Sequence, residues 1–124
     1  DNVSANQVSV AREFAIENRV VVVLKSAVTV IAEPGGMVYV SSRPNSGLAR
    51  GGSGDLLSGL IAGLAATGVS DINAAIAGVH ILSEAAEITR AELGADAMSV
   101  SEIASYIPKA FRAVRGDFDV KPPA

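Results

Sequence analysis

Residues 46–55 read Ser-Gly-Leu-Ala-Arg-Gly-Gly-Ser-Gly-Asp, and residues 56–64 continue with the apolar run Leu-Leu-Ser-Gly-Leu-Ile-Ala-Gly-Leu. Glycine has no Cβ, so this loop can turn tightly and lie close to a ligand. We expect a helix to begin at or just after Ser53. Its first amide groups have no acceptor within the helix, and the helix dipole places about half a positive charge at that end. This arrangement suits an anion such as a nucleotide phosphate.

Asp55 lies in the first turn of the expected helix, where its carboxylate can face the same anion site. A purely structural interpretation stays open, in which Ser53 is an N-cap, Asp55 is a favourable first-turn acid and the glycines form only a connection. Short glycine motifs also have many chance matches. The chain lacks the Lys-Ser or Lys-Thr ending of a P-loop, and no Gly-x-Gly-x-x-Gly follows a strand, which argues against both of those nucleotide-binding motifs.

The composition predicts one domain with an aliphatic core. The chain has 124 residues, of which 49% are hydrophobic and only 4% are aromatic, so the core must consist of Ala, Val, Ile and Leu. The formal net charge of −3, without a basic cluster, argues against nucleic acid as the main partner. The absence of cysteine excludes disulfides and thiolate metal sites and fits a reducing compartment such as the cytoplasm.

Neither a targeting nor a membrane-spanning segment is visible in this sequence. The N-terminus is polar, which does not match a signal peptide. The longest apolar run, residues 56–69, is interrupted by Ser, Thr and Gly and is shorter than the ~20 residues that span a bilayer. We therefore expect a soluble, cytoplasmic protein with no membrane partner.

The first third of the chain predicts a helix followed by strands. Residues 1–7 are polar and expected to be frayed, and the apolar spacing predicts a helix over Val8–Asn18. The continuous apolar run Val20–Leu24, β-branched at its four valines, is typical of a strand buried on both faces of a mainly parallel sheet. The expected buried face of the helix is led by Val10 and Phe14, with Ala11 and Ala15 beside them.

A hairpin and a long loop follow this strand. Residues 28–32 and 37–41 read as two strands, and Glu33–Gly36 between them reads as a hairpin turn. Residues 42–52 form the loop that leads into the glycine motif, and its length indicates a function beyond simple connection.

Three helices are predicted after the loop. The first, Gly54–Thr67, is apolar on nearly every side, so we expect it to be buried, with Gly59 and Gly63 in close packing contacts and Gly68 at its C-cap. Ser70 or Asp71 caps the second, which ends near Gly94. Its expected buried stripe contains Ile72, Ala75, Ile76, Val79, Leu82, Ala86 and Ile88.

The third helix is opened by a capping box, Ser99 to Glu102. Pro108 lacks an amide donor and is expected to kink or restart this helix, and residues 117–124 are expected to form a tail. Its expected inward residues are Ile103, Tyr106 and Ile107.

Several segments together resemble the C-terminal half of the ADP/ATP-dependent NAD(P)H-hydrate dehydratases, a branch of the ribokinase-like superfamily. They are VVLKSAVTVIA at 22–32, PGG at 34–36, NSGLA at 45–49, GSGDLLSGLIA at 52–62, and Gly68. The match keeps its order and spacing over residues 10–115, which makes it far more specific than one glycine motif. It implies a three-layer α/β/α fold of which this chain, residues 1–124, is the C-terminal portion, the N-terminal half of the domain being absent.

The resemblance also implies a reaction and a site. Such enzymes restore NADH or NADPH whose nicotinamide ring has been hydrated: ADP or ATP, carried with Mg²⁺, donates a phosphoryl group to the ring hydroxyl, and phosphate is then eliminated. No dedicated protein cage for the ion is visible. By this resemblance Asp55 meets the hydroxyl of the hydrate, and the amides of Gly52, Ser53 and Gly54 hold the developing phosphate charge. The implied nucleotide contacts are Lys25, Ser26, Ala27, Val28, Thr29 and Gly54.

This chain departs from the family pattern at three positions. Ser26 stands where glycine is usual, and Arg50 stands where a small residue is usual, either reaching phosphate as a fork donor or remaining solvated. The family often has a histidine near Leu82, but the single histidine here, His80, lies two positions earlier on another helical face, and we assign it no role.

Structural interpretations of other charged residues stay open. Without the family pattern, Lys25 is also explained as a solvent-exposed lysine at the end of an apolar strand. The charged residues Glu84, Glu87 and Arg90 are expected to form a solvated helix face.

Two other functions remain open at this stage. One is a ribokinase-like kinase acting on a sugar or a vitamin alcohol, with Asp55 as the base and a phosphorylated product released. The other is a nucleotide-binding remnant that lacks the catalytic half and does not turn over substrate. An exposed apolar sheet edge also predicts a homo-oligomer.

Overall fold

The computed structural model describes residues 2–43 and 51–116. The predicted tail at 117–124, the central part of the predicted loop and Arg50 lie outside the described residues. Within these ranges the elements are, in order, α1 (Asn2–Asn18), β1 (Val22–Lys25), β2 (Thr29–Ala32), β3 (Val38–Val40), α2 (Ser53–Ala66), α3 (Asp71–Leu93), the short 3-10 helix η2 (Ala95–Ala97), α4 (Val100–Ser105) and α5 (Ile107–Arg115).

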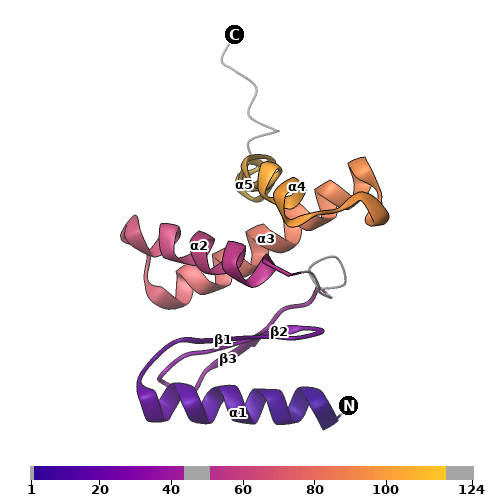
Figure 1. Cartoon of the computed structure of the whole chain (residues 1–124). Helices are drawn as coiled ribbons and strands as arrows, with labels where there is room; N and C mark the ends of the chain where they lie inside the picture. Colours follow the sequence, from indigo (N-terminus) through magenta and orange to yellow (C-terminus); the bar gives the residue numbers. More distant parts are fainter. Residues whose placement is uncertain (1, 44–50, 117–124) are drawn as a thin grey trace.

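The elements form three layers (Figure 1). Helix α1 covers one face of the small sheet, and α2 and α3 lie on the other, with α4 and α5 beyond α3. Two groups of buried side chains follow from this arrangement. The larger surrounds α3, and the smaller lies between α1 and the sheet. The layering agrees with the predicted α/β/α architecture.

The sheet is an antiparallel meander in the order β1-β2-β3. The predicted hairpin is confirmed: Ala32 is paired with Val38, and Gly36 takes a φ of +95° in the turn. The prediction of a parallel strand buried on both faces is wrong for this part of the sheet. The first strand pairs antiparallel with β2, from Val22 opposite Ala32 to Lys25 opposite Thr29, and its residues are only half-buried. A run of β-branched residues indicates a strand, but it does not fix the direction of the neighbouring strand.

Helix α1 is longer than predicted and is turned differently. It begins at Asn2, so the expected fraying of residues 1–7 is wrong for all described residues of that segment. Ala11 and Ala15 are buried as expected, whereas Val10 and Phe14 are 52% and 54% exposed. The small alanines allow the helix to lie close to Val30 and Ala32 of the sheet. The larger pair was therefore wrongly assigned to the buried face.

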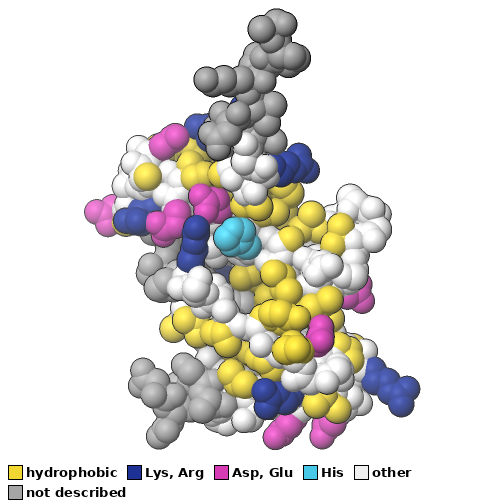
Figure 2. Space-filling view, turned by 180° about the vertical axis from the view of Figure 1, so that it is seen from behind, with side chains coloured by type: hydrophobic (Ala, Val, Ile, Leu, Met, Phe, Trp, Pro, Cys, Tyr) yellow, Lys and Arg dark blue, Asp and Glu magenta, His cyan; other side chains and the backbone are white. Residues whose placement is uncertain are grey.

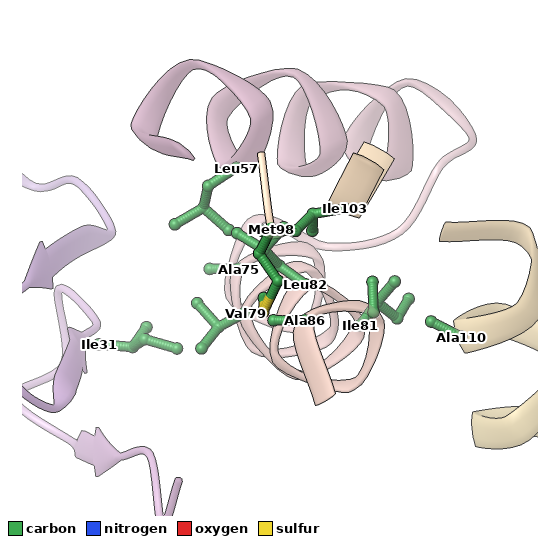
Figure 3. Packing of buried hydrophobic residues seen from close by; sticks show 11 residues of the cluster. Ile31, Leu57, Ala75, Val79, Ile81, Leu82, Ala86, Met98, Ile103 and Ala110 are labelled. Atoms are coloured by element: carbon green, nitrogen blue, oxygen red, sulfur yellow. The ribbon is translucent and has the colours of Figure 1, made fainter. Parts of the chain in front are cut away.

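The larger core confirms the predicted stripe of α3. Ala75, Val79, Leu82 and Ala86 are buried, and Ile72, Ile76 and Ile88 pack against them while remaining partly accessible. Figure 3 shows Ile31 of the sheet and Leu57 of α2 directed toward α3 from different sides, and Ala110 of α5 lying beyond Ile81.

The predicted ends of the C-terminal helices agree with the structure. The Ser70 side chain caps α3 by accepting from the Asn73 amide, and the Ser99 side chain caps α4 by accepting from the Glu102 amide at 3.1 Å. The last predicted helix is restarted at Pro108, which lies in the first turn of α5. Ile103 is fully buried, while Tyr106 and Ile107 are partly buried.

Helix α2 is less enclosed than its composition indicates. Only Ser53 and Leu57 are buried, and a Cβ added at Gly59 or Gly63 would meet nothing within 4 Å among the described residues. The predicted close packing of these two glycines is therefore wrong in the described part of the chain. The close contact lies instead on α3: a Cβ added at Gly78 would lie 2.6 Å from Ile61 Cγ1.

Gly78→Ala tests this close contact between α2 and α3. Alanine is a better helix former than glycine by about 1 kcal/mol, but the Cγ1 of Ile61 is held by a stiff, β-branched side chain and overpacking costs roughly 1–3 kcal/mol. We expect a net loss of about 1 kcal/mol in the free energy of unfolding, measured by urea denaturation. Combining it with Ile61→Ala should cost less than the sum of the two single changes, and strict additivity would contradict the contact.

Candidate functional site

The end of β1 meets the start of α2. Lys25 is the last residue of β1 and Ser53 the first of α2, and the Lys25 Nζ donates a hydrogen bond to the Ser53 Oγ. These residues are 28 positions apart in the chain. The fold therefore brings the predicted nucleotide segment, residues 25–29, next to the predicted anion site at Gly52–Gly54.

Gly52 provides the entry into α2. It is the N-cap residue, with a φ of +92°, a left-handed conformation that disfavours any residue with a side chain. Its carbonyl accepts the first helical hydrogen bond, from the Leu56 amide at 3.1 Å. The structural interpretation of Ser53 as the N-cap is thus wrong: Ser53 is the first helical residue, it is buried, and its hydroxyl faces Lys25.

Among the described residues, nothing crowds Gly54 at the start of α2. Gly54 is exposed, and a Cβ added there would meet no described atom within 4 Å. Asp55 is also exposed and lies in the first turn, one residue further along. The first-turn amides of a helix have no intrahelical acceptor and favour an anion. An anion can therefore approach Gly54 with the Asp55 carboxylate beside it.

Lys25 adds a partly desolvated positive charge to this corner. Burial lowers the pKa of its ammonium below the ordinary value, because taking the charged form out of water is unfavourable. The charge lies close to the positive end of the α2 dipole as well. Both features favour a bound anion at this position.

The turn between β1 and β2 is tight. The Ser26 amide and hydroxyl both donate to the Val28 carbonyl, at 3.2 and 3.0 Å. Ala27 at the tip is exposed, whereas Thr29 at the start of β2 is buried. The five predicted nucleotide contacts, residues 25–29, therefore form one compact hairpin turn. The sequence analysis did not predict this turn, because it placed the first strand in a parallel sheet.

A cavity of about 200 Å³ lies between the sheet and α3. Ser41 lines one wall of the cavity, and its amide donates a hydrogen bond to the Thr29 carbonyl at 2.8 Å. This backbone hydrogen bond places the cavity beside the end of the turn 25–29. The buried Ser83 hydroxyl on the α3 side has no hydrogen-bond partner among the described residues. The cavity is lined by Ile31, Tyr39, Val40, Ser41, Ser42, Arg43, Ile76, Val79, His80 and Ser83.

An ion pair joins Arg43, at the rim of this cavity, to Glu84 of α3. Arg43 Nη1 lies 2.6 Å from Glu84 Oε2, so the expectation that Glu84 belongs to a solvated face is wrong. Glu87 and Arg90, in contrast, do form an exposed pair on α3. His80, the single histidine, is exposed at the surface (cyan in Figure 2) and also lines the cavity. Ile76, His80 and Ser83 have a helical spacing that places them on one face of α3. This spacing is the signal in the sequence that could have indicated the α3 wall of the cavity.

Two negative findings concern only residues 2–43 and 51–116. Within these ranges no three His, Asp or Glu side chains lie close enough together to hold a metal ion. The helices there are all too short or too polar to cross a membrane.

Comparison with known proteins defines the class. The family model for NAD(P)H-hydrate dehydratase matches residues 1–109. The chain therefore belongs to the NAD(P)H-hydrate dehydratase family, as its sequence motifs imply. Its fold matches the crystal structure of the ADP/ATP-dependent NAD(P)H-hydrate dehydratase from Bacillus subtilis co-crystallized with ATP/Mg²⁺, with a TM-score of 0.81 and 29% identity over 90% of this chain and 40% of that one. The predicted ribokinase-like α/β fold is confirmed as a partial one.

Two curated relatives carry related names. The bifunctional NAD(P)H-hydrate repair enzyme Nnr of Thermofilum pendens is 40% identical over 96% of this chain. The ADP-dependent (S)-NAD(P)H-hydrate dehydratase of Neisseria meningitidis is 37% identical over 74% of it. This chain spans 23% of the first relative's length and 31% of the second's.

Lys25→Met tests the partly buried charge. Because burial lowers the Lys25 pKa, the unfolded chain binds more protons than the folded one between the lowered and the ordinary value, and stability rises with pH across that window. We expect the wild type to gain stability relative to Lys25→Met as the pH is raised through the alkaline range. Urea unfolding at a series of pH values checks this, and a stability difference that shrinks or stays constant contradicts it.

Proposed function

We propose that this chain forms the nucleotide-side part of an enzyme that uses ADP or ATP to dehydrate hydrated NADH or NADPH. The observation that carries the proposal is the hydrogen bond between Lys25 and Ser53, because it joins the hairpin turn 25–29 to the start of α2. Family membership supplies the reaction class. The remaining contacts to the hydrated nicotinamide belong, in this proposal, to the N-terminal half of the domain.

The nucleotide phosphates are proposed to lie at the start of α2. The amides of Gly52, Ser53 and Gly54 hold the transferring phosphoryl group, and the Lys25 ammonium adds a full positive charge. Phosphoryl transfer depends mainly on positioning and charge stabilisation, and this corner offers both. Among the described residues no atom lies within 4 Å of a Cβ added at Gly54, which supports an approach to the backbone there. Mg²⁺ is proposed to arrive with the nucleotide as part of the co-substrate.

The nucleotide base is proposed to occupy the cavity beside α3. That cavity adjoins Thr29 through the Ser41–Thr29 hydrogen bond and has the apolar residues Ile76 and Val79 in its wall. The buried Ser83 hydroxyl is positioned on the same wall and can bond to a ring nitrogen. In this arrangement the ribose of the nucleotide contacts the turn 25–29, and its phosphates contact the start of α2.

Asp55 is proposed to act on the substrate hydroxyl. The carboxylate accepts the hydroxyl proton as the oxygen attacks the terminal phosphorus, and the bond from that phosphorus to the leaving nucleotide oxygen breaks. The phosphorylated hydrate then loses phosphate with its C–O electron pair, a ring proton leaves, and the double bond of the dihydronicotinamide is restored. The position of Asp55 in the first turn of α2 supports this assignment.

Asp55→Asn tests the catalytic assignment. We expect turnover of hydrated NADH with ADP or ATP to fall at least 100-fold, on the order of a lost general base, while nucleotide binding measured by calorimetry persists. Recovery of the absorbance of the reduced nicotinamide reports turnover in the full-length protein. The matched control is Asp71→Asn, which changes an exposed first-turn acid of α3 and should leave turnover unchanged. Full activity of Asp55→Asn would reduce Asp55 to a helix-start residue.

Lys25→Met tests the phosphate assignment separately. Removing the ammonium should weaken binding of ADP and ATP on the order of tenfold, the scale of one charge-assisted hydrogen bond. The control is Lys109→Met on α5, where the lysine pairs with Glu92 at the surface. Equal nucleotide affinities of Lys25→Met and wild type would exclude a phosphate contact.

The same assays separate the alternative functions. A sugar or alcohol kinase would release a phosphorylated product with no recovery of reduced nicotinamide, and a non-catalytic remnant would bind nucleotide without turnover. The expected homo-oligomer stays a prediction that sedimentation of the full-length protein can test.

A further inference from the structure

The turn that is proposed to contact the nucleotide is held by a side chain from α1. Gln7 Nε2 donates to the Ser26 Oγ at 2.7 Å, and this pair is partly buried. The Ser26 hydroxyl in turn donates to the Val28 carbonyl at 3.0 Å. A hydroxyl has one proton to donate, so accepting from Gln7 and donating to Val28 fixes its orientation.

Helix α1 makes a second contact of the same kind at the other end of the sheet. The Arg12 Nε donates to the Gly36 carbonyl at 3.2 Å, in the turn between β2 and β3. The two hairpin turns of the meander are thus each bound by one side chain of the same helix. Only the first turn adjoins Lys25 and the start of α2.

We propose that Gln7 is a positioning residue for the adenine nucleotide, acting through Ser26 on the turn 25–29. This inference rests on the proposed function, since it assumes that the turn contacts the nucleotide. A glycine at position 26 would give this turn more conformational freedom. In this chain the Gln7–Ser26–Val28 series of hydrogen bonds restricts that freedom before the nucleotide arrives. Pre-organisation of this kind improves affinity by lowering the ordering cost on binding.

The test compares the two ends of α1 in the full-length protein. We expect Gln7→Ala to raise the dissociation constants for ADP and ATP roughly three- to tenfold, the range of one lost hydrogen bond. Arg12→Ala removes the corresponding contact at the far turn and should change nucleotide affinity less than about twofold. Calorimetry measures the affinities, and thermal unfolding of both variants measures their stabilities.

A double-mutant cycle shows whether Gln7 acts through Ser26. In Ser26→Gly the hydroxyl is gone, so adding Gln7→Ala should have no further effect on nucleotide affinity. In steady-state kinetics Gln7→Ala should raise the KM for the nucleotide and leave kcat nearly unchanged. A purely structural role for Gln7 would lower stability without this split.

Three results would overturn the inference. The first is wild-type affinity of Gln7→Ala, and the second is an equal loss of affinity in Gln7→Ala and Arg12→Ala. The third is an additive effect of Gln7→Ala in the Ser26→Gly background. Each of these leaves wild-type nucleotide binding intact, so none touches the proposed function. A wild type that binds no adenine nucleotide would refute the proposed function, and the positioning role of Gln7 with it.

Discussion

The hydrogen bond from Lys25 to Ser53 joins a strand end to a helix start across 28 residues of sequence. It places an ammonium group beside the positive end of a helix dipole, an arrangement that is electrostatically unfavourable in isolation. Partial burial of Lys25 adds to the cost of the charge, and its pKa is accordingly lowered. An anion placed here would offset the repulsion between the ammonium and the helix dipole. This electrostatic arrangement supports the proposed position of the phosphates.

The two groups of buried side chains explain why this corner has a fixed shape. Val30 and Ala32 of β2 face α1, while Ile31 between them faces α3. Alternate residues of a strand point to opposite faces of a sheet, so one short strand joins both layers. The close approach of α2 to α3 at Gly78 fixes the position of α2 as well. The packing of the sheet, α2 and α3 thus fixes the position of the turn 25–29 relative to Gly52.

Local signals in the sequence predicted where turns and helices begin and end better than they predicted which elements pack against each other. The Glu33–Gly36 turn, the Ser70 and Ser99 caps and the restart at Pro108 follow from chemistry within a few residues, and the structure has all of them. The pairing of β1 and the exposure of Phe14 depend on which elements pack together, which periodicity alone does not specify. Gly59 and Gly78 show the same limit, since two helical glycines look alike in sequence, and among the described residues a close contact with another helix is found at Gly78 and not at Gly59.

For the site, the family pattern predicted more than the residue chemistry could. Glycine content and helix capping left Ser53 and Asp55 open to a structural interpretation. The order of the motifs, in contrast, assigned Lys25 to the nucleotide segment, and in the structure Lys25 contacts Ser53. The cavity beside α3 was not predicted, because its wall combines Ser41, Arg43 and Ser83 from distant parts of the chain. Side chains that meet only in three dimensions leave no local signal.

The middle strand β2 has a consequence for how this region moves. All four of its residues are buried, and its neighbours pair with it on both edges. Its central amides should therefore be among the slowest in the chain to exchange hydrogen with solvent, because exposing them requires separation of a hairpin that is packed on both faces. The strand β2 therefore acts as a rigid support behind the turn 25–29 and the start of α2.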